Sequence, residues 1–182
     1  MKRDFLAVTD LTREEIEHIY ELSRDLKAKT RARQPHPLLK GKILAMIFQK
    51  PSARTRVSFE VGMLQLGGHA LYLAPSDLQM GKRESTADVA RVLSRYCDGI
   101  MARVFAHQDV VDLATHASVP VINGLSDLLH PCQVLSDLFT IEEHLGRRED
   151  FALAWIGDGN NVCHSWLNMS TRFRIDFRLA IP

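Results

Sequence analysis

Short apolar runs alternate along this chain with segments whose apolar residues recur every three or four positions. Such alternation is typical of an α/β fold, in which helices cover both faces of a mostly parallel sheet. The expected strands are 43–48, 69–73, 100–104 and 119–123, and the expected helices are 55–66, 86–96, 108–117 and 133–144. An earlier helix begins after Thr12, which forms a capping box with Glu15. The proline-containing segment 31–40 is expected to be a loop.

A second unit begins after the polar stretch 146–150, which has the composition of a linker. It reads as a strand at 151–156, a helix that continues to about Phe173, and a strand at 177–180. This is the opening β-α-β of another parallel domain, so we predict two domains, 1–146 and 151–182. Two strands cannot bury both faces of a sheet. We therefore expect either a truncated sequence or a partner that covers the exposed surface.

Composition and residue spacing argue against several classes of function. The 182 residues carry 23 Lys and Arg against 22 Asp and Glu, spread along the chain, which argues against a nucleic-acid-binding surface. No apolar run is long enough for a membrane span or a signal core. Cys97, Cys132 and Cys163 are far apart and odd in number, as expected of free thiols in the cytoplasm. The eight histidines lack metal-ligand spacing, so no metal site is expected.

The most informative segment follows the first strand of the sheet. It consists of Ser52-Ala53-Arg54-Thr55-Arg56. A strand that ends where a helix begins leaves backbone N–H groups free at the positive end of the helix dipole. Two hydroxyls and two guanidiniums at that point would form a receptor for a phosphate dianion. The alternative is a Ser52 helix cap beside two solvated arginines.

Polar clusters follow the other strands as well. They are the loop Gln79–Ser85 with Lys82, Arg103 at the end of strand three, and Asn123-Gly124 with His130-Pro131-Cys132-Gln133 after strand four. In an open parallel sheet, ligands bind outside the carboxyl ends of the strands. Four such clusters at one edge predict a site for a small anionic substrate.

These clusters differ in how strongly they indicate a ligand. A guanidinium in an apolar run must find an anion or carbonyl groups, which favours a ligand role for Arg103. His130 and Gln133 fit either a helix cap with a surface glutamine or two donors aimed at a carbonyl oxygen. Gln79 and Lys82 lie in a glycine-containing polar loop, whose residue types favour a solvated loop over a ligand site. Cys132 has no assignable base beside it, so it is expected to pack rather than to react.

Together these residues resemble the aspartate/ornithine transcarbamylase family, and within it the ornithine branch. The family motif S-T-R-T-R is present as residues 52–56, and H-P-x-Q as residues 130–133. The stretches 81–85, 101–105, 123–127 and 155–161 also look like the ornithine branch. The likeness covers nearly the whole chain. It implies a carbamoyl-phosphate-binding domain at 1–146 and an incomplete ornithine-binding domain at 151–182.

The resemblance also implies roles for individual residues. Carbamoyl phosphate would be bound by Ser52, Ala53, Arg54, Thr55, Gln79, Arg103, His130 and Gln133, with Arg103, His130 and Thr55 catalytic, and Asn161 would contact ornithine. Ala53 replaces the usual threonine, so binding should be weakened but not abolished. The family segments S-M-G and H-C-L-P, and the closing helix, lie beyond the sequence given. The resemblance implies no cofactor, and a homotrimer in which the loop 79–82 reaches a neighbour's site.

The implied activity is transfer of the carbamoyl group from carbamoyl phosphate to the δ-amine of L-ornithine. Two alternatives remain open. The aspartate branch shares the phosphate half of the site, so the acceptor is not fixed. The chain could also be a non-catalytic fragment that binds carbamoyl phosphate, or that only assembles with other chains.

Overall fold

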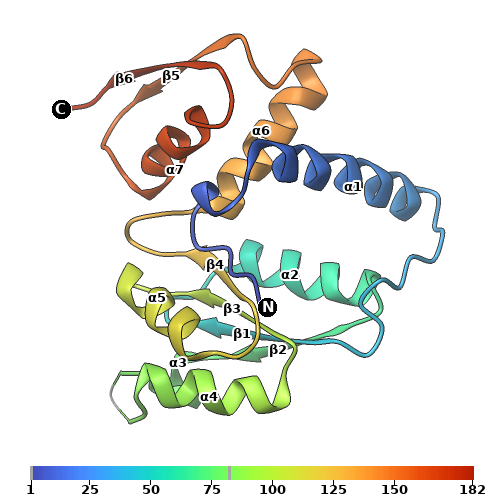
Figure 1. The fold of residues 1–182 in the computed structure, drawn as a ribbon, viewed down its shortest axis with the longest axis vertical. Helices are drawn as coiled ribbons and strands as arrows, with labels where there is room; N and C mark the ends of the chain where they lie inside the picture. Colours follow the sequence, from blue (N-terminus) through green and yellow to red (C-terminus); the bar gives the residue numbers. More distant parts are fainter. Residues whose placement is uncertain (1, 82) are drawn as a thin grey trace.

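The computed structural model describes residues 2–81 and 83–182, and in that part of the chain it contains two parallel sheets (Figure 1). The larger has the strand order β2-β1-β3-β4, and the smaller pairs β5 with β6. The strands are β1 Ile43–Phe48, β2 His69–Leu73, β3 Gly99–Arg103, β4 Val121–Leu125, β5 Phe151–Ile156 and β6 Ile175–Ala180. The predicted α/β fold is confirmed.

Helices cover both faces of the larger sheet (Figure 1). They are α1 Arg13–Arg31, α2 Ala53–Gln65, α3 Pro75–Leu78, α4 Thr86–Tyr96, α5 His107–His116, α6 Pro131–Leu145 and α7 Asn161–Ser170, with a short 3₁₀ turn at Val8–Asp10. The helices α4 and α5 pack on one face, and α2 packs on the other. Buried on both sides, the central strands β1 and β3 are apolar except for Arg103 at the end of β3, as parallel strands usually are.

Alternation along the strands decides which face each side chain joins. In β1, Leu44, Met46 and Phe48 pack with α2, whereas Ala45 and Ile47 pack in the cluster with α4 and α5. In β3, Met101 belongs to the α2 side. Arg103 lies two residues further on, so the period of two directs it toward the same side. The alternation along β3 therefore places the Arg103 side chain on the face of the sheet that α2 covers.

Several element bounds differ from the predicted ones for local reasons. The helix α2 starts at Ala53 rather than Thr55, because Ser52 acts as its N-cap. The strand β4 runs two residues later than expected, since Pro120 has no N–H for the ladder. The short helix α3 was not predicted, although Pro75 at its first position is a start signal. The strand β6 begins at Ile175, two residues earlier than expected.

The second unit packs against the first through one apolar cluster. This cluster includes Ile16 and Tyr20 of α1, Leu138 of α6, and Trp166 and Met169 of α7, all almost completely buried. The two sheets share no ladder in the described part of the chain. The boundary between residues 146 and 151 stays a prediction.

The amino-terminal segment adds to the open edge of β4. Phe5 N–H donates to Val121 O, and Asn123 N–H donates to Phe5 O, both at 2.8 Å. These bonds satisfy backbone groups that an edge strand would otherwise expose. None of the helices within residues 2–81 and 83–182 combines the length and the apolar character needed to span a bilayer.

Candidate anion-binding site

A polar cavity of about 320 Å³ lies where β3 and β4 end and α2 and α6 begin. Six of the predicted site residues line it: Ser52, Arg54, Thr55, Arg103, His130 and Gln133. They come from three separate parts of the chain. The convergence expected at the carboxyl edge of the sheet is therefore present for the polar clusters after β1, β3 and β4.

Ser52 serves as a helix cap and as part of the cavity wall. Its Oγ accepts the N–H of Thr55 at 3.3 Å and lies 3.0 Å from Thr55 Oγ1. Ala53 and Arg54 occupy the first turn of α2, where backbone N–H groups have no carbonyl within the helix. The helix thus presents its positive end to the cavity. The two interpretations of Ser52 are compatible.

Only one of the two arginines in this segment faces the cavity. Arg54 lines it, whereas the guanidinium of Arg56 lies 4.0 Å from the centre of the Tyr72 ring and 3.2 Å from Glu60. Residues two apart on a helix point in nearly opposite directions, because each residue turns the helix by 100°. The expectation of two guanidiniums in the phosphate receptor is wrong for Arg56.

Arg103 brings a largely uncompensated positive charge to the cavity. Its Nη1 lies 3.5 Å from Thr55 Oγ1, and its buried Nε has no hydrogen-bond partner among the described residues. The β3–β4 register shifts here, from Ala102 opposite Asn123 to Arg103 opposite Leu125, so the extra residue, Gly124, lies in β4 and the alternation along β3 is kept. Burial and the nearby Arg54 charge lower the pKa of Arg103. Both effects would be relieved by a bound anion.

His130 occupies the N-cap position of α6, but its side chain does not cap the helix. Its Nδ1 is buried and finds no partner within the described chain. Burial, with a smaller contribution from the Arg103 charge, lowers the pKa of His130 to about 4. The ring is therefore neutral near pH 7, with one N–H to donate and one nitrogen to accept.

The side-chain amide of Gln133 makes one hydrogen bond within α6. Its Nε2 donates to Asp137 Oδ1 at 2.7 Å, one turn further along the helix. An amide NH₂ group has two N–H donors, so one N–H and the carbonyl oxygen are left to bind a ligand. The expected pair of donors, His130 and Gln133, stays a prediction.

Three other predicted residues lie outside this cavity. Gln79 lines a separate cavity of about 390 Å³, together with Phe48 of β1 and Phe105, which follows β3. Ala53 is exposed at the start of α2 and is not part of the cavity wall. Asn161 donates its side-chain N–H to Ser126 O at 2.6 Å. Lys82 lies outside the described residues.

The cavity wall also contains residues that sequence reasoning did not identify: Ser58, Phe59, Leu125, Cys132 and Ser136. Helical spacing could have identified two of them, since Ser58 follows Arg54, and Ser136 follows Cys132, by one turn. Gly124 was noted only as part of a polar cluster. A Cβ at this position would lie 2.4 Å from Met101 Sδ, so glycine permits close approach of β4 to β3.

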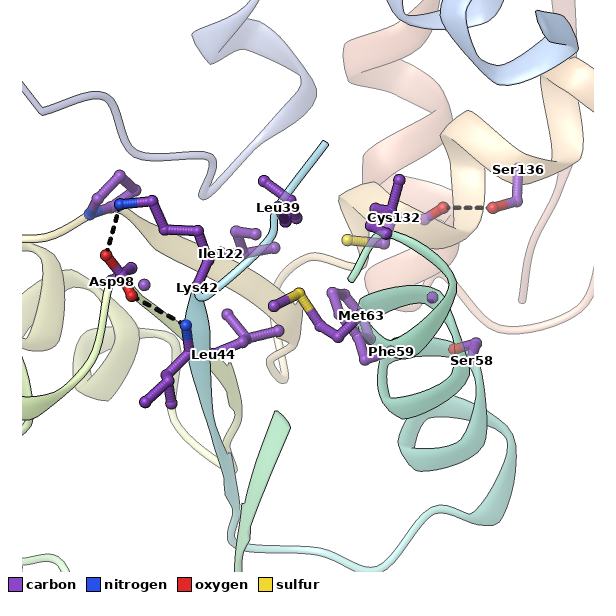
Figure 2. A pocket seen from close by; sticks show the side chains of 15 residues that line it. Leu39, Lys42, Leu44, Ser58, Phe59, Met63, Asp98, Ile122, Cys132 and Ser136 are labelled. Carbon is purple, nitrogen blue, oxygen red and sulfur yellow. Dashed lines mark hydrogen bonds and ion pairs between the residues drawn. The ribbon is translucent and has the colours of Figure 1, made fainter. Parts of the chain in front are cut away.

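A larger and mostly apolar cavity of about 690 Å³ adjoins the polar one (Figure 2). It lies at the amino ends of β1 and β3, with Leu44, Phe59 and Met63 around it. Cys132 belongs to the walls of both cavities. Burial raises the pKa of the Cys132 thiol to about 12, so this sulfur is a poor nucleophile near neutral pH. Its expected packing role agrees with this environment.

Known proteins are similar to this chain in sequence and in fold. A family model described as aspartate/ornithine carbamoyltransferase, carbamoyl-P binding domain, matches residues 3–143. The ornithine carbamoyltransferase of Pyrococcus horikoshii is 57% identical over 180 residues, covering 99% of this chain and 57% of that protein.

Solved structures of the same family superpose closely on this chain. The ornithine carbamoyltransferase of Pyrococcus furiosus gives a TM-score of 0.96 at 56% identity, over 99% of this chain and 57% of that one. The catalytic subunit of M. jannaschii aspartate transcarbamoylase gives 0.88 at 32% identity, over 99% and 60%. The chain thus spans less than two thirds of the length of these relatives. It belongs to the aspartate/ornithine carbamoyltransferase family.

Proposed function

We propose that this chain binds carbamoyl phosphate and forms the carbamoyl-phosphate half of an ornithine carbamoyltransferase. The proposal rests on one observation: Arg54, Arg103 and His130 line the same cavity, beside the amino end of a helix. A dianion with a carbonyl group needs concentrated positive charge at one end and neutral donors at the other. This cavity has both.

The phosphate group would lie at the start of α2. Arg54, the hydroxyl of Ser52 and the free N–H groups of the first helical turn are all donors, and charge-assisted bonds of this kind are strong. The carbamoyl carbonyl oxygen would face Arg103, His130 and Thr55. The oxygen of Gln133 would accept from the carbamoyl NH₂, while one N–H of its own amide stays on Asp137.

The reaction requires no protein nucleophile. The neutral δ-amine of ornithine attacks the carbamoyl carbon, forming the new C–N bond. The C–O bond to phosphate then breaks, and the leaving phosphate can take the amine proton. Arg103, His130 and Thr55 stabilise the charge on the carbonyl oxygen, and each well-aimed donor is worth about 2.7–4 kcal/mol. Orientation of two bound substrates supplies much of the remaining acceleration.

Ornithine is the acceptor we favour, because identity to the named ornithine enzymes exceeds identity to the aspartate transcarbamoylase. Asn161 would contribute to its binding. The side-chain oxygen of Asn161 could accept from an ammonium group while its N–H stays on Ser126. An aspartate acceptor is the second candidate, since the phosphate half of the site serves both.

A homotrimer in the cytoplasm is the assembly and location that we propose. The outer side of α2 exposes Val57, Val61 and Leu64 at 57%, 42% and 59%. Three apolar side chains at helical spacing form a surface that a second copy could cover. Gln79 lies outside the cavity of its own chain, which supports a role for its loop in the site of a neighbour.

Titration calorimetry with carbamoyl phosphate tests the proposed site. Arg54→Ala should weaken binding roughly ten- to hundred-fold, because it removes charge-assisted bonds to the phosphate. Arg56→Ala is the matched control: the same residue type, two positions along the same helix, stacked on Tyr72. It should bind as the wild type does.

Equal losses in the two variants would contradict the assignment, and so would unchanged affinity in folded Arg54→Ala. Circular dichroism establishes that each variant is folded. Arg54 is exposed, so its removal should leave the fold intact.

A further inference from the structure

Three side chains of α7 hold the loop that precedes α6. The contacts run from Asn161 Nδ2 to Ser126 O (2.6 Å), from His164 Nδ1 to Leu128 O (3.0 Å), and from His130 N to Ser165 Oγ (2.8 Å). The three helical positions lie at i, i+3 and i+4, on one face of α7. The loop residues that they contact are every second residue. The whole strand-to-helix connection is thus fixed from one side.

Ser165 is the most buried of these contacts, with 1% of its surface exposed. Its hydroxyl accepts from His130 N–H and donates to Asn161 O at 2.8 Å. It directly precedes Trp166, which belongs to the apolar cluster of α1, α6 and α7. A buried hydroxyl costs free energy unless its hydrogen bonds are made. Alanine at this position would leave His130 N–H without its acceptor.

The side chain of His130 has little else to hold it. Its Nδ1 is without a hydrogen-bond partner in the part of the chain that the structure describes, and the ring makes no capping bond. The direction of the imidazole therefore depends on the backbone from which it projects. That backbone is fixed by the hydrogen bond from His130 N–H to Ser165.

We propose that Ser165 is a positioning residue, whose hydroxyl holds the His130 backbone so that the imidazole points at the carbamoyl oxygen. This rests on the proposed function of the cavity. It also means that α7, which lies beyond residue 151, sets the geometry of a group placed in the first unit. The hydrogen bond between His130 N–H and Ser165 would affect contacts to the carbonyl end of the ligand. Arg54 and the start of α2 would contact the phosphate end.

The test compares Ser165→Ala with Ser170→Ala in the 182-residue chain. Ser170 lies on the same helix and donates to Trp166 O at 3.0 Å, and among the described residues it makes no hydrogen bond to the loop. Carbamoyl phosphate and inorganic phosphate are titrated into each variant. Ser165→Ala should lose roughly tenfold in affinity for carbamoyl phosphate and much less for inorganic phosphate. Ser165→Thr, which keeps the hydroxyl, should restore the preference, and Ser170→Ala should not alter it.

A second measurement follows the His130 ring by NMR in the absence of ligand. Arg103 of β3 and Arg54 of α2 are the charged groups that face the cavity with it. In Ser165→Ala the ring should gain water, and its titration midpoint should rise toward the ordinary value. Ser165→Cys, close in size but a weak acceptor, gives the same comparison if alanine prevents folding.

An unchanged midpoint and an unchanged preference in the Ser165 variants would overturn the positioning role. Failure of the wild type to bind either phosphate compound would instead refute the proposed function. In that case the titration of the His130 ring would still show whether Ser165 positions it. Failure of the positioning role and failure of the proposed function are therefore distinguishable.

Discussion

Arg103 and His130 are partly buried in the cavity wall, whereas Arg54 is exposed. Each has a buried nitrogen without a protein partner in the described chain, and burial lowers the pKa of both. Native proteins rarely leave buried polar atoms unpaired, and those that remain are often reserved for a ligand. An incoming anion with a carbonyl group would satisfy both residues at once.

The low pKa of His130 predicts an acid-sensitive fold. The pKa is about 4 in the folded chain and 6.5 ordinarily, so the unfolded chain binds the extra proton between these values. Stability should therefore fall as the pH drops from 6.5 toward about 4. Urea unfolding across this range checks the sign. His130→Gln cannot titrate and should show a shallower dependence.

The dependence in His130→Gln should not vanish, because burial also lowers the pKa of His107. A steeper loss of stability in His130→Gln than in the wild type would contradict the neutral state of the ring.

At the scale of single residues, the sequence identified cavity residues by type and position, but not their directions. Arg103 could be predicted, because a cation in a buried apolar strand needs a partner. The outward direction of Arg56 was also predictable from helical geometry. The amide orientation of Gln133 was not, because it depends on the position of Asp137 in the folded helix.

Among the helices and strands, α2 contributes both to the stability of the fold and to the proposed binding of phosphate. Its cap, Ser52, ends an extended segment and begins the helix whose positive end faces the cavity. The same hydroxyl that stabilises the helix is thus available to a phosphate oxygen.

Ser52→Ala should therefore affect both properties. Loss of an N-cap costs about 0.5–2 kcal/mol of stability, and phosphate binding should weaken too. Thr12 caps α1 with the same 3.3 Å contact and does not line the cavity. Thr12→Ala should lose similar stability with unchanged affinity, as measured by urea unfolding and calorimetry. If both variants bound equally well, Ser52 would be a cap alone.

The elements themselves were largely predictable, because strand and helix periodicities are local. Which elements are neighbours in the folded chain was harder to predict. Alternation of strands and helices does not give the order β2-β1-β3-β4, and it does not predict that Gln79 lines a different cavity. The contact of α7 with the loop before His130 was also not predictable, since it joins residues 35 apart through tertiary packing.

At the scale of the whole molecule, the exposed apolar side of α2 is the surface proposed for assembly. Val61→Glu should place a charge in that surface and lower the mass observed by sedimentation, because an unpaired charge is costly in an apolar interface. Val92→Glu on α4, where the native side chain is 50% exposed, is the control and should leave the mass unchanged. A wild-type chain that sediments as a monomer would contradict the proposed trimer.

The central claim is that one cavity binds both ends of an acyl phosphate. A crystal structure of this chain with carbamoyl phosphate tests it most directly. Phosphorus density should lie beside Ser52 and Arg54, with the carbonyl oxygen within hydrogen-bond distance of Arg103 and His130. Carbamoyl phosphate bound elsewhere, with this cavity occupied only by water, would contradict it.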